Sequence, residues 1–152
     1  MARVWIYQAD RFLTDAEVEH IAQEANEFIR TWTAHGTALA GRVSVEHNLF
    51  LLLLVDEEQA LATGCSIDKS VHFVQALGQR YGIDFFNRMN TAYRSNVDDS
   101  LQLATREEFA QRLKEGIVNQ ETLVYNNLIQ DSSELSTKWE VPFAVSWHSK
   151  VF

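Results

Sequence analysis

The feature that most constrains the fold is an unbroken run of apolar side chains from Phe50 to Val55. A strand with one face in water alternates apolar and polar residues, whereas a strand covered on both faces is apolar at every position. The run therefore predicts a central strand. Extended to Leu49–Val55, it is still far shorter than the roughly 20 residues that cross a bilayer, and the N-terminal residues lack the apolar core of a signal peptide. We therefore expect no membrane partner.

Other segments predict strands around this central one. Arg3–Tyr7 is rich in residues that favour strands, and Arg42–Glu46 alternates polar and apolar residues. His47-Asn48 predicts the turn of a hairpin that leads into the central strand. Two further strands are expected at 88–94 and 100–104, joined by a short polar segment.

Capping residues predict where three helices begin. Thr14 and Thr105 each open a capping box, and Ser66 is the expected N-cap of the helix between them. Gly82 predicts the end of that second helix. One side of the second helix is expected to face the core: Ile67, Val71, Val74, Leu77 and Tyr81.

The order of these elements predicts an α+β fold, mainly an antiparallel sheet with helices packed on it. Within the first 94 residues the order is β-α-β-β-α-β, that of a ferredoxin-like core, and the rest is expected to be C-terminal additions. The segment 33–36 predicts a loop, and 121–129 fits a strand or a helix. With no repeat or linker, we expect a single domain over residues 1–152.

Charge and cysteine content bound the class of function. The formal net charge is -8, and no run of Lys and Arg offers a patch for phosphates, so no nucleic-acid partner is expected. Cys65 is the only cysteine, which favours a reducing, cytoplasmic location. The sequence leaves open whether the chain forms a homo-oligomer.

Nearly the whole chain resembles a family of short Bacteroidetes proteins whose members often carry the label "ABC transporter ATPase". The stretches that carry the resemblance are VWIYQADRFLT at 4–14, TAHG at 33–36, VDE at 55–57, GCSIDKSVHF at 64–73, and WEVP and SWH near the C-terminus. The family has no established activity. The resemblance therefore implies a lineage and a chain size, and no catalytic residues.

The sequence lacks the motif that an ATPase of this kind needs. FLLLLVDE at 50–57 resembles a Walker B strand, but a P-loop also needs two glycines ahead of Lys-Ser. At the nearest candidate, Lys69-Ser70, Thr63 and Asp68 stand where those glycines should be, and the carboxylate would repel phosphate. We therefore expect no ATPase activity and no bound nucleotide or other cofactor.

The sharpest catalytic candidates are Cys65, Asp68 and His72. The positive end of the helix that follows Cys65 would favour a reactive thiolate, and Asp68 at four residues from His72 could orient the imidazole. The two ends of this set are seven residues apart, about 10 Å along a helix. A small buried cysteine beside a solvated polar stripe is the structural alternative.

No pair of histidines or cysteines has the short sequence spacing that is typical of a metal site. The histidines show no H-E-x-x-H pattern, so any site would have to assemble from distant residues such as His35, His72, His148 and Asp56. We predict no metal ion. Whether the acidic group at 56–58 meets a cation is left open.

Aromatic side chains near the C-terminus suggest a binding surface. Trp139 and Trp147 flank a proline, and with His148 and His35 they are the candidates for contact with a ligand or partner. Core packing is the structural alternative. The expected function is a small binding or regulatory protein that is not an enzyme and takes a protein or small-molecule ligand. The alternative is a thiol-dependent enzyme or redox sensor built on Cys65.

Overall fold

The computed structural model describes residues 2–58 and 60–152, which form two compact units. The first unit contains the chain up to Asn87 together with Gln130–Ser132. The second contains Arg88–Ile129 and Ser133–Phe152. The expectation of a single domain stays a prediction. The α+β class is confirmed, because helices accompany antiparallel sheets.

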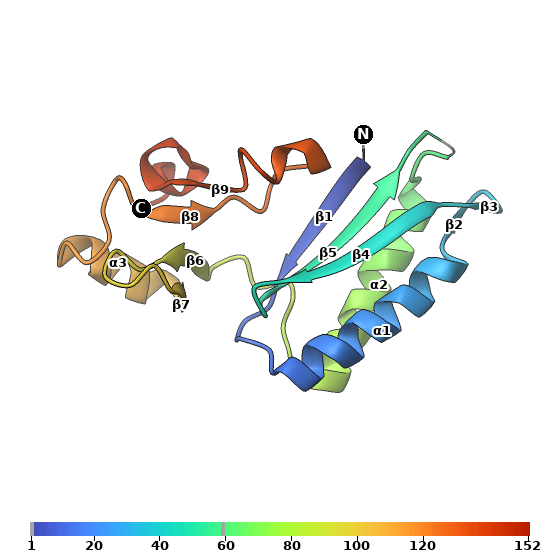
Figure 1. Cartoon of the computed structure of the whole chain (residues 1–152), viewed down its shortest axis with the longest axis horizontal. Coiled ribbons are helices and arrows are strands. Elements are labelled where there is room, and N and C mark those ends of the chain that lie inside the picture. Colours follow the sequence, from blue (N-terminus) through green and yellow to red (C-terminus); the bar gives the residue numbers. More distant parts are fainter. Residues whose placement is uncertain (1, 59) are drawn as a thin grey trace. The chain divides into compact units, whose positions relative to one another are not determined.

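The sheet of the first unit has the predicted apolar run at its centre. Strand β5 (Phe50–Asp56) lies between β1 (Ala2–Gln8) and β4 (Ala40–Glu46), and both pairings are antiparallel (Figure 1). Every residue of β5 from Phe50 to Val55 is buried. The central, doubly covered strand is therefore confirmed, as is the turn at His47-Asn48, where both residues have positive φ.

The prediction of the last strand of the ferredoxin-like core is wrong. Residues 91–94 form a strand of the second unit, and the position beside β1 is taken by Gln130–Ser132. The Val4 N–H donates to the Gln130 carbonyl at 2.9 Å, and Arg3 pairs with Asp131 in an antiparallel bridge. The β-α-β-β-α order of the first unit is thus followed beside β1 by a single bridge rather than by a fourth strand.

Helices α1 (Asp15–Thr31) and α2 (Gly64–Tyr81) accompany this sheet (Figure 1). The capping box at Thr14 is confirmed. The predicted N-cap of α2 is wrong by one turn, because Thr63 caps the helix. Ser66 is the N3 residue, and its hydroxyl oxygen accepts a hydrogen bond from the Thr63 N–H. Gly82 ends α2 in the left-handed conformation, as predicted.

The buried side of α2 also differs from the predicted apolar stripe. Ile67 and Val71 are only partly buried, while small residues take the fully buried positions. The buried residues of α2 are Ser66, Ser70, Val74, Leu77 and Gly78. At Gly78 the reason is close approach, because a Cβ added there would collide with the backbone carbonyl oxygen of Ile83.

The predicted loop at 33–36 is a small hairpin instead. Strands β2 (Thr33–Ala34) and β3 (Thr37–Ala38) pair across a two-residue turn in which His35 and Gly36 have φ of 53° and 78°. Positive φ at both central residues matches the twist of a hairpin, so the segment pairs with itself.

The second unit has a four-stranded antiparallel sheet in the order β7-β6-β8-β9. Its strands are β6 (Thr91–Arg94), β7 (Leu101–Ala104), β8 (Leu123–Tyr125) and β9 (Glu140–Pro142). Helix α3 (Arg106–Lys114) starts at the predicted Thr105 capping box and buries Phe109. The core of this unit contains Tyr93, Ala104, Phe109, Val118, Val124 and Phe143.

The C-terminal part consists mostly of short 3-10 turns. They are η1 (Ser132–Glu134), η2 (Phe143–Val145) and η3 (Trp147–Lys150). The buried Phe143 and the partly buried Phe152 pack on Phe109, so this segment belongs to the core of the second unit. Across residues 2–58 and 60–152, every helix is too short or too polar to span a bilayer.

Candidate functional site

The structure places Cys65, Asp68 and His72 on one exposed stripe of α2. Cys65 lies in the first turn of the helix, and all three side chains are exposed. Successive members are three and four residues apart, so each neighbours the next, while Cys65 and His72 are two turns apart. No hydrogen bond or ion pair joins these three described residues. The stripe therefore does not bring the thiol to the imidazole.

The metal candidates belong to different elements of the two units. His35 sits at the exposed β2–β3 turn, His72 on α2, and His148 in the second unit. Within the described part of the chain, no three His, Cys, Asp or Glu side chains are grouped to hold a metal ion. Asp56 and Glu57 instead accept backbone N–H bonds from Glu58 and Ala62 at 3.1 and 2.8 Å, which shapes the turn after β5.

The two C-terminal tryptophans have different surroundings. Trp139 is 7% exposed, and its indole N–H donates to Asn127 Oδ1 at 2.8 Å. Trp147 is only partly buried, yet its Nε1 is buried without a hydrogen-bond partner among the described residues. Trp139 is therefore a core residue, and Trp147 is the one whose ring meets solvent.

His148 is a buried histidine beneath Trp147. It is 3% exposed, and its ring stacks on the Trp147 ring with centroids 3.9 Å apart. Its Nδ1 shares a hydrogen bond of 2.5 Å with the Ser146 hydroxyl, which is also buried. Burial away from water lowers the pKa of His148 to about 4. The imidazole is therefore neutral at pH 7 and serves the packing of the second unit.

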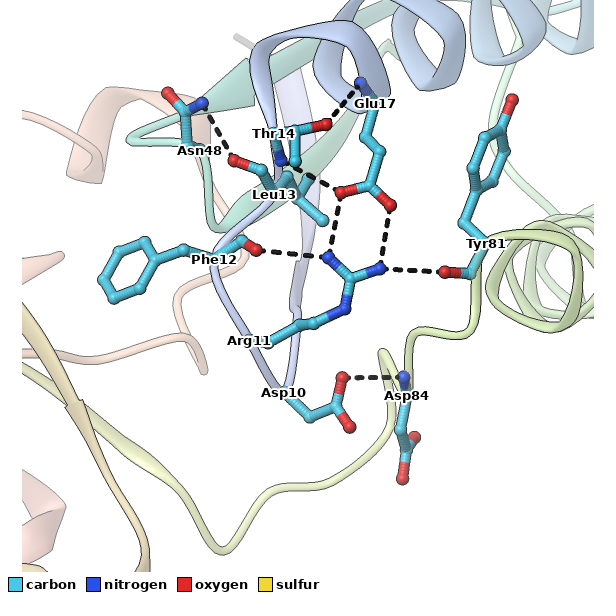
Figure 2. A network of polar contacts seen from close by, with 9 residues as sticks. All are labelled: Asp10, Arg11, Phe12, Leu13, Thr14, Glu17, Asn48, Tyr81 and Asp84. Atoms are coloured by element: carbon cyan, nitrogen blue, oxygen red, sulfur yellow. Dashed lines mark hydrogen bonds and ion pairs between the residues drawn. The ribbon is translucent and has the colours of Figure 1, made fainter.

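A polar network in the first unit joins the β1–α1 connection to the end of α2 (Figure 2). Arg11 forms a bidentate pair with Glu17 at 2.8 Å per bond and donates to the Tyr81 carbonyl, near the end of α2, at 2.8 Å. This pairing and the Thr14 cap lower the pKa of Glu17 to about 2. The bonds of this network join backbone and side-chain groups of the two segments, so its role is structural.

The second unit contains a groove that sequence analysis did not identify. Its cavity volume is about 480 Å³, and we call it the loop groove. It is lined by the β6–β7 connection and by two residues before and within β8: Arg94–Asp99, Glu121 and Leu123. Binding residues commonly lie on such loops, held in place by a rigid sheet.

The β6–β7 turn is fixed by its own hydrogen bonds. The Asp99 N–H donates to the Ser95 carbonyl at 3.0 Å, and Ser100 donates from its N–H and its hydroxyl to Asp98. These bonds lower the pKa of Asp98, which stays ionised at neutral pH. At the tip of this ordered turn, Val97 is 94% exposed.

Asn96 anchors the turn to the neighbouring loop. Its side-chain amide donates to the Ile117 carbonyl at 3.1 Å and to the Thr122 hydroxyl at 3.0 Å. Ile117 is itself 51% exposed, so the anchored loops present two apolar side chains to solvent. A single exposed valine is ordinary, but two on loops locked to each other form a preorganised surface.

The charge of the loop groove is negative. Asp98, Asp99 and Glu121 contribute carboxylates, and Arg94 is the one basic residue of its lining. Arg94 is already matched by Glu140, with Nε and Oε1 3.6 Å apart. Within the described chain, the carboxylates of Asp99 and Glu121 have no hydrogen-bond or ion-pair partner. The groove can therefore accept positive charge at no cost to an existing pair.

Comparison with protein-family models, with curated proteins and with solved structures found no match to this chain.

Proposed function

We propose that the chain is a binding protein whose loop groove captures a basic segment of a protein partner that also carries an apolar side chain. The observation that carries this proposal is Val97, which is held 94% exposed by a hydrogen-bonded turn between the carboxylates of the groove. A single exposed valine is ordinary, but Val97 lies on a loop anchored through Asn96 to that of Ile117, which is 51% exposed, so the two loops present a preorganised apolar surface. A partner that covers it would recover the hydrophobic free energy.

The charges of the groove select the class of partner. Lys or Arg side chains of the partner would pair with Asp99 and Glu121, which have no partner among the described residues. The formal net charge of -8 would also speed the approach of a basic segment. Because the turn is fixed before binding, little conformational entropy is lost on association.

A defined probe tests this proposal in the full-length chain. A hexapeptide of alternating Lys and Leu is titrated into isotopically labelled protein, and chemical shifts are followed by NMR. The expected shifts map to residues 94–99 and to Leu123, with weaker binding as salt is raised. The double variant Asp99→Asn, Glu121→Gln should weaken binding by roughly three- to tenfold.

The matched control removes two charges elsewhere. Glu19→Gln with Glu27→Gln changes the net charge equally on the exposed side of α1, and it should leave the affinity unchanged. Equal weakening by both double variants would mean that the peptide senses only net charge. That result, or chemical shifts spread over both units, would contradict the proposal that the loop groove binds the peptide.

Thiol chemistry at Cys65 is the alternative proposal. Two observations support it: the thiol is exposed, and it lies in the first turn of α2. The rate of Cys65 alkylation against pH in the native protein tests it. Half-maximal reactivity well below about pH 7.5 would support an activated nucleophile. A midpoint near that of an ordinary thiol would contradict this alternative.

A further inference from the structure

The two edge strands of the sheet in the first unit differ in whether another segment pairs with them. The edge beside β1 is covered by Gln130–Ser132, through the bridge to Asp131 and the bond from the Val4 N–H. Strand β4 is the opposite edge, and its only strand partner among the described residues is β5. An uncovered edge strand is a template for pairing with another strand.

Strand β4 is also long and unprotected for an edge. It has seven residues and no proline or lysine, whereas the edge strands of the second unit, β7 and β9, have four and three. Short strands, prolines and lysines are the usual protection against pairing between molecules. The other sheet edges are therefore short or covered, whereas β4 is long and available for pairing.

The register shows which backbone groups of β4 face outward. The Ala9 N–H bonds to the Leu49 carbonyl, so odd-numbered residues of β5 face β1 and even-numbered residues face β4. Arg42 and Ser44 lie opposite Leu54 and Leu52, and their backbone groups therefore bond to β5. The N–H and C=O groups of Val43 and Val45 point away from the sheet, while the Gly41 N–H bonds to the Leu39 carbonyl at 2.9 Å.

The side chains of β4 are complementary to a second copy of the same strand. In antiparallel pairing centred on Ser44, Arg42 of one copy lies opposite Glu46 of the other, and Val43 lies opposite Val45. This register makes Val43 and Val45 the hydrogen-bonded pair, as their outward backbone groups require. It makes Arg42 and Glu46 the non-bonded pair, in which side chains are closest.

The charges of β4 are available for such pairing. Arg42 is exposed, and no described residue gives it a hydrogen bond or an ion pair. The Glu46 carboxylate accepts a bond from the Ser44 hydroxyl, which holds it on the face of the strand that also carries Arg42. Sliding one strand by two residues centres the pairing on Val43 and places Arg42 opposite Ser44 and Glu46 opposite Ala40, so the charges lose their partners. Sliding it by four residues centres the pairing on Arg42 and places the two arginines opposite each other. Charge therefore selects the register centred on Ser44.

We propose that two copies of this chain form a two-fold symmetric dimer by antiparallel pairing of their β4 strands, with Arg42 of each opposite Glu46 of the other. The sheet of the first unit then continues from one copy into the next. Such an interface uses the same surface on both copies and closes on itself, so it does not build a fibre. The proposal involves only the first unit and is independent of the loop groove.

Charge exchange tests the dimer in the full-length chain. Sedimentation equilibrium of the unsubstituted protein should show a dimer that dissociates on dilution. Arg42→Glu alone, or Glu46→Arg alone, places like charges opposite each other twice per dimer and should weaken dimerisation by about tenfold or more. The double variant Arg42→Glu, Glu46→Arg exchanges the charges and should restore it. Failure of the double variant to recover, with circular dichroism unchanged, would overturn the register.

Hydrogen exchange tests the same strand without substitution. At high protein concentration the amides of Val43 and Val45 should be protected, and on dilution they should become fast, while those of Arg42 and Ser44 stay protected by β5 at both concentrations. Val45→Pro removes only an outward N–H, so the fold should survive and the dimer should be lost. A chain that is monomeric at every concentration, with fast exchange at Val43 and Val45, would overturn the proposal.

Discussion

Burial of His148 makes the stability of the second unit depend on pH, and the size of the effect follows from the structure. The imidazole is 3% exposed, and its pKa is lowered from 6.5 to about 4 by loss of hydration. In the unfolded chain the same group takes up a proton at an ordinary pKa. Between these values the unfolded state binds more protons than the folded state, so stability falls as pH falls. The contribution is complete above pH 6.5 and is lost as pH approaches 4.

The magnitude comes from the difference between the pKa of His148 in the unfolded and the folded chain. A tenfold change in proton affinity corresponds to about 1.4 kcal/mol, so the full effect is about 3 kcal/mol. Between pH 7 and pH 5 the expected loss is about 2 kcal/mol, because the folded state still takes up almost no proton there. This window also lies above 4.5, the pKa near which Glu17 takes up its proton in the unfolded chain, so the lowered pKa of Glu17 adds little to the loss.

Urea unfolding at pH 7 and pH 5 measures this loss as the change in the free energy of unfolding. His148→Asn keeps a side-chain atom able to bond with Ser146 and cannot be charged. It should be less stable at pH 7, because the stack on Trp147 is lost, but its stability should fall by about 2 kcal/mol less between the two pH values. His72→Asn, at an exposed position of α2, is the matched control and should keep the pH slope of the unsubstituted chain.

Equal slopes for the unsubstituted protein and His148→Asn would refute the reasoning. They would mean that His148 takes up a proton in the folded state without cost, and so that the Trp147 ring does not keep water from it. A direct NMR titration of the His148 ring separates the two cases. The protonation midpoint should lie near the pKa of about 4.

Three further substitutions have definite expected outcomes. Gly78→Ala should lower the free energy of unfolding by about 1–3 kcal/mol, because the new Cβ would meet the Ile83 carbonyl, and thermal unfolding measures this. Trp139→Phe should cost more stability in urea unfolding than Trp147→Phe, because Trp139 loses a buried hydrogen bond while Trp147 loses a donor that has no partner among the described residues. Cys65→Ser should change stability by less than about 0.5 kcal/mol, since the thiol is exposed, and a larger loss in the same assay would show packing that the structure does not contain.

The fold is predictable from the sequence where a signal is contained within one element. The capping boxes at Thr14 and Thr105 place helix starts correctly because both partners of each box lie within four residues. The run Phe50–Val55 identifies a central strand because burial on both faces excludes polar residues along its whole length. Periodicity and capping are local, and they are independent of what the element packs against.

The errors arise where a distant segment decides the outcome. Gln130–Ser132 lies beside β1 through a single bridge, and three residues are too few to show any periodicity, so the nearer strand at 91–94 takes that place in the prediction. On α2, hydrophobicity favours Ile67 and Val71 over Ser70, which is buried. Ser70 satisfies its hydroxyl by donating to the Ile67 carbonyl, so its burial leaves no polar group without a partner.

The loop groove escapes prediction because aromatic side chains are the more familiar indicators of binding. The tryptophans at 139 and 147 are large enough to fill a core or to anchor a partner. Neither their positions in the sequence nor the residues beside them tell which ring is buried. The segment 95–99 contains a more specific signal, since Val97 stands alone among polar residues in a tight turn. A side chain at the tip of such a turn cannot reach the core of its own unit, because turns run over the surface. An apolar residue there is exposed by geometry, whereas an aromatic residue can equally be taken up by the core.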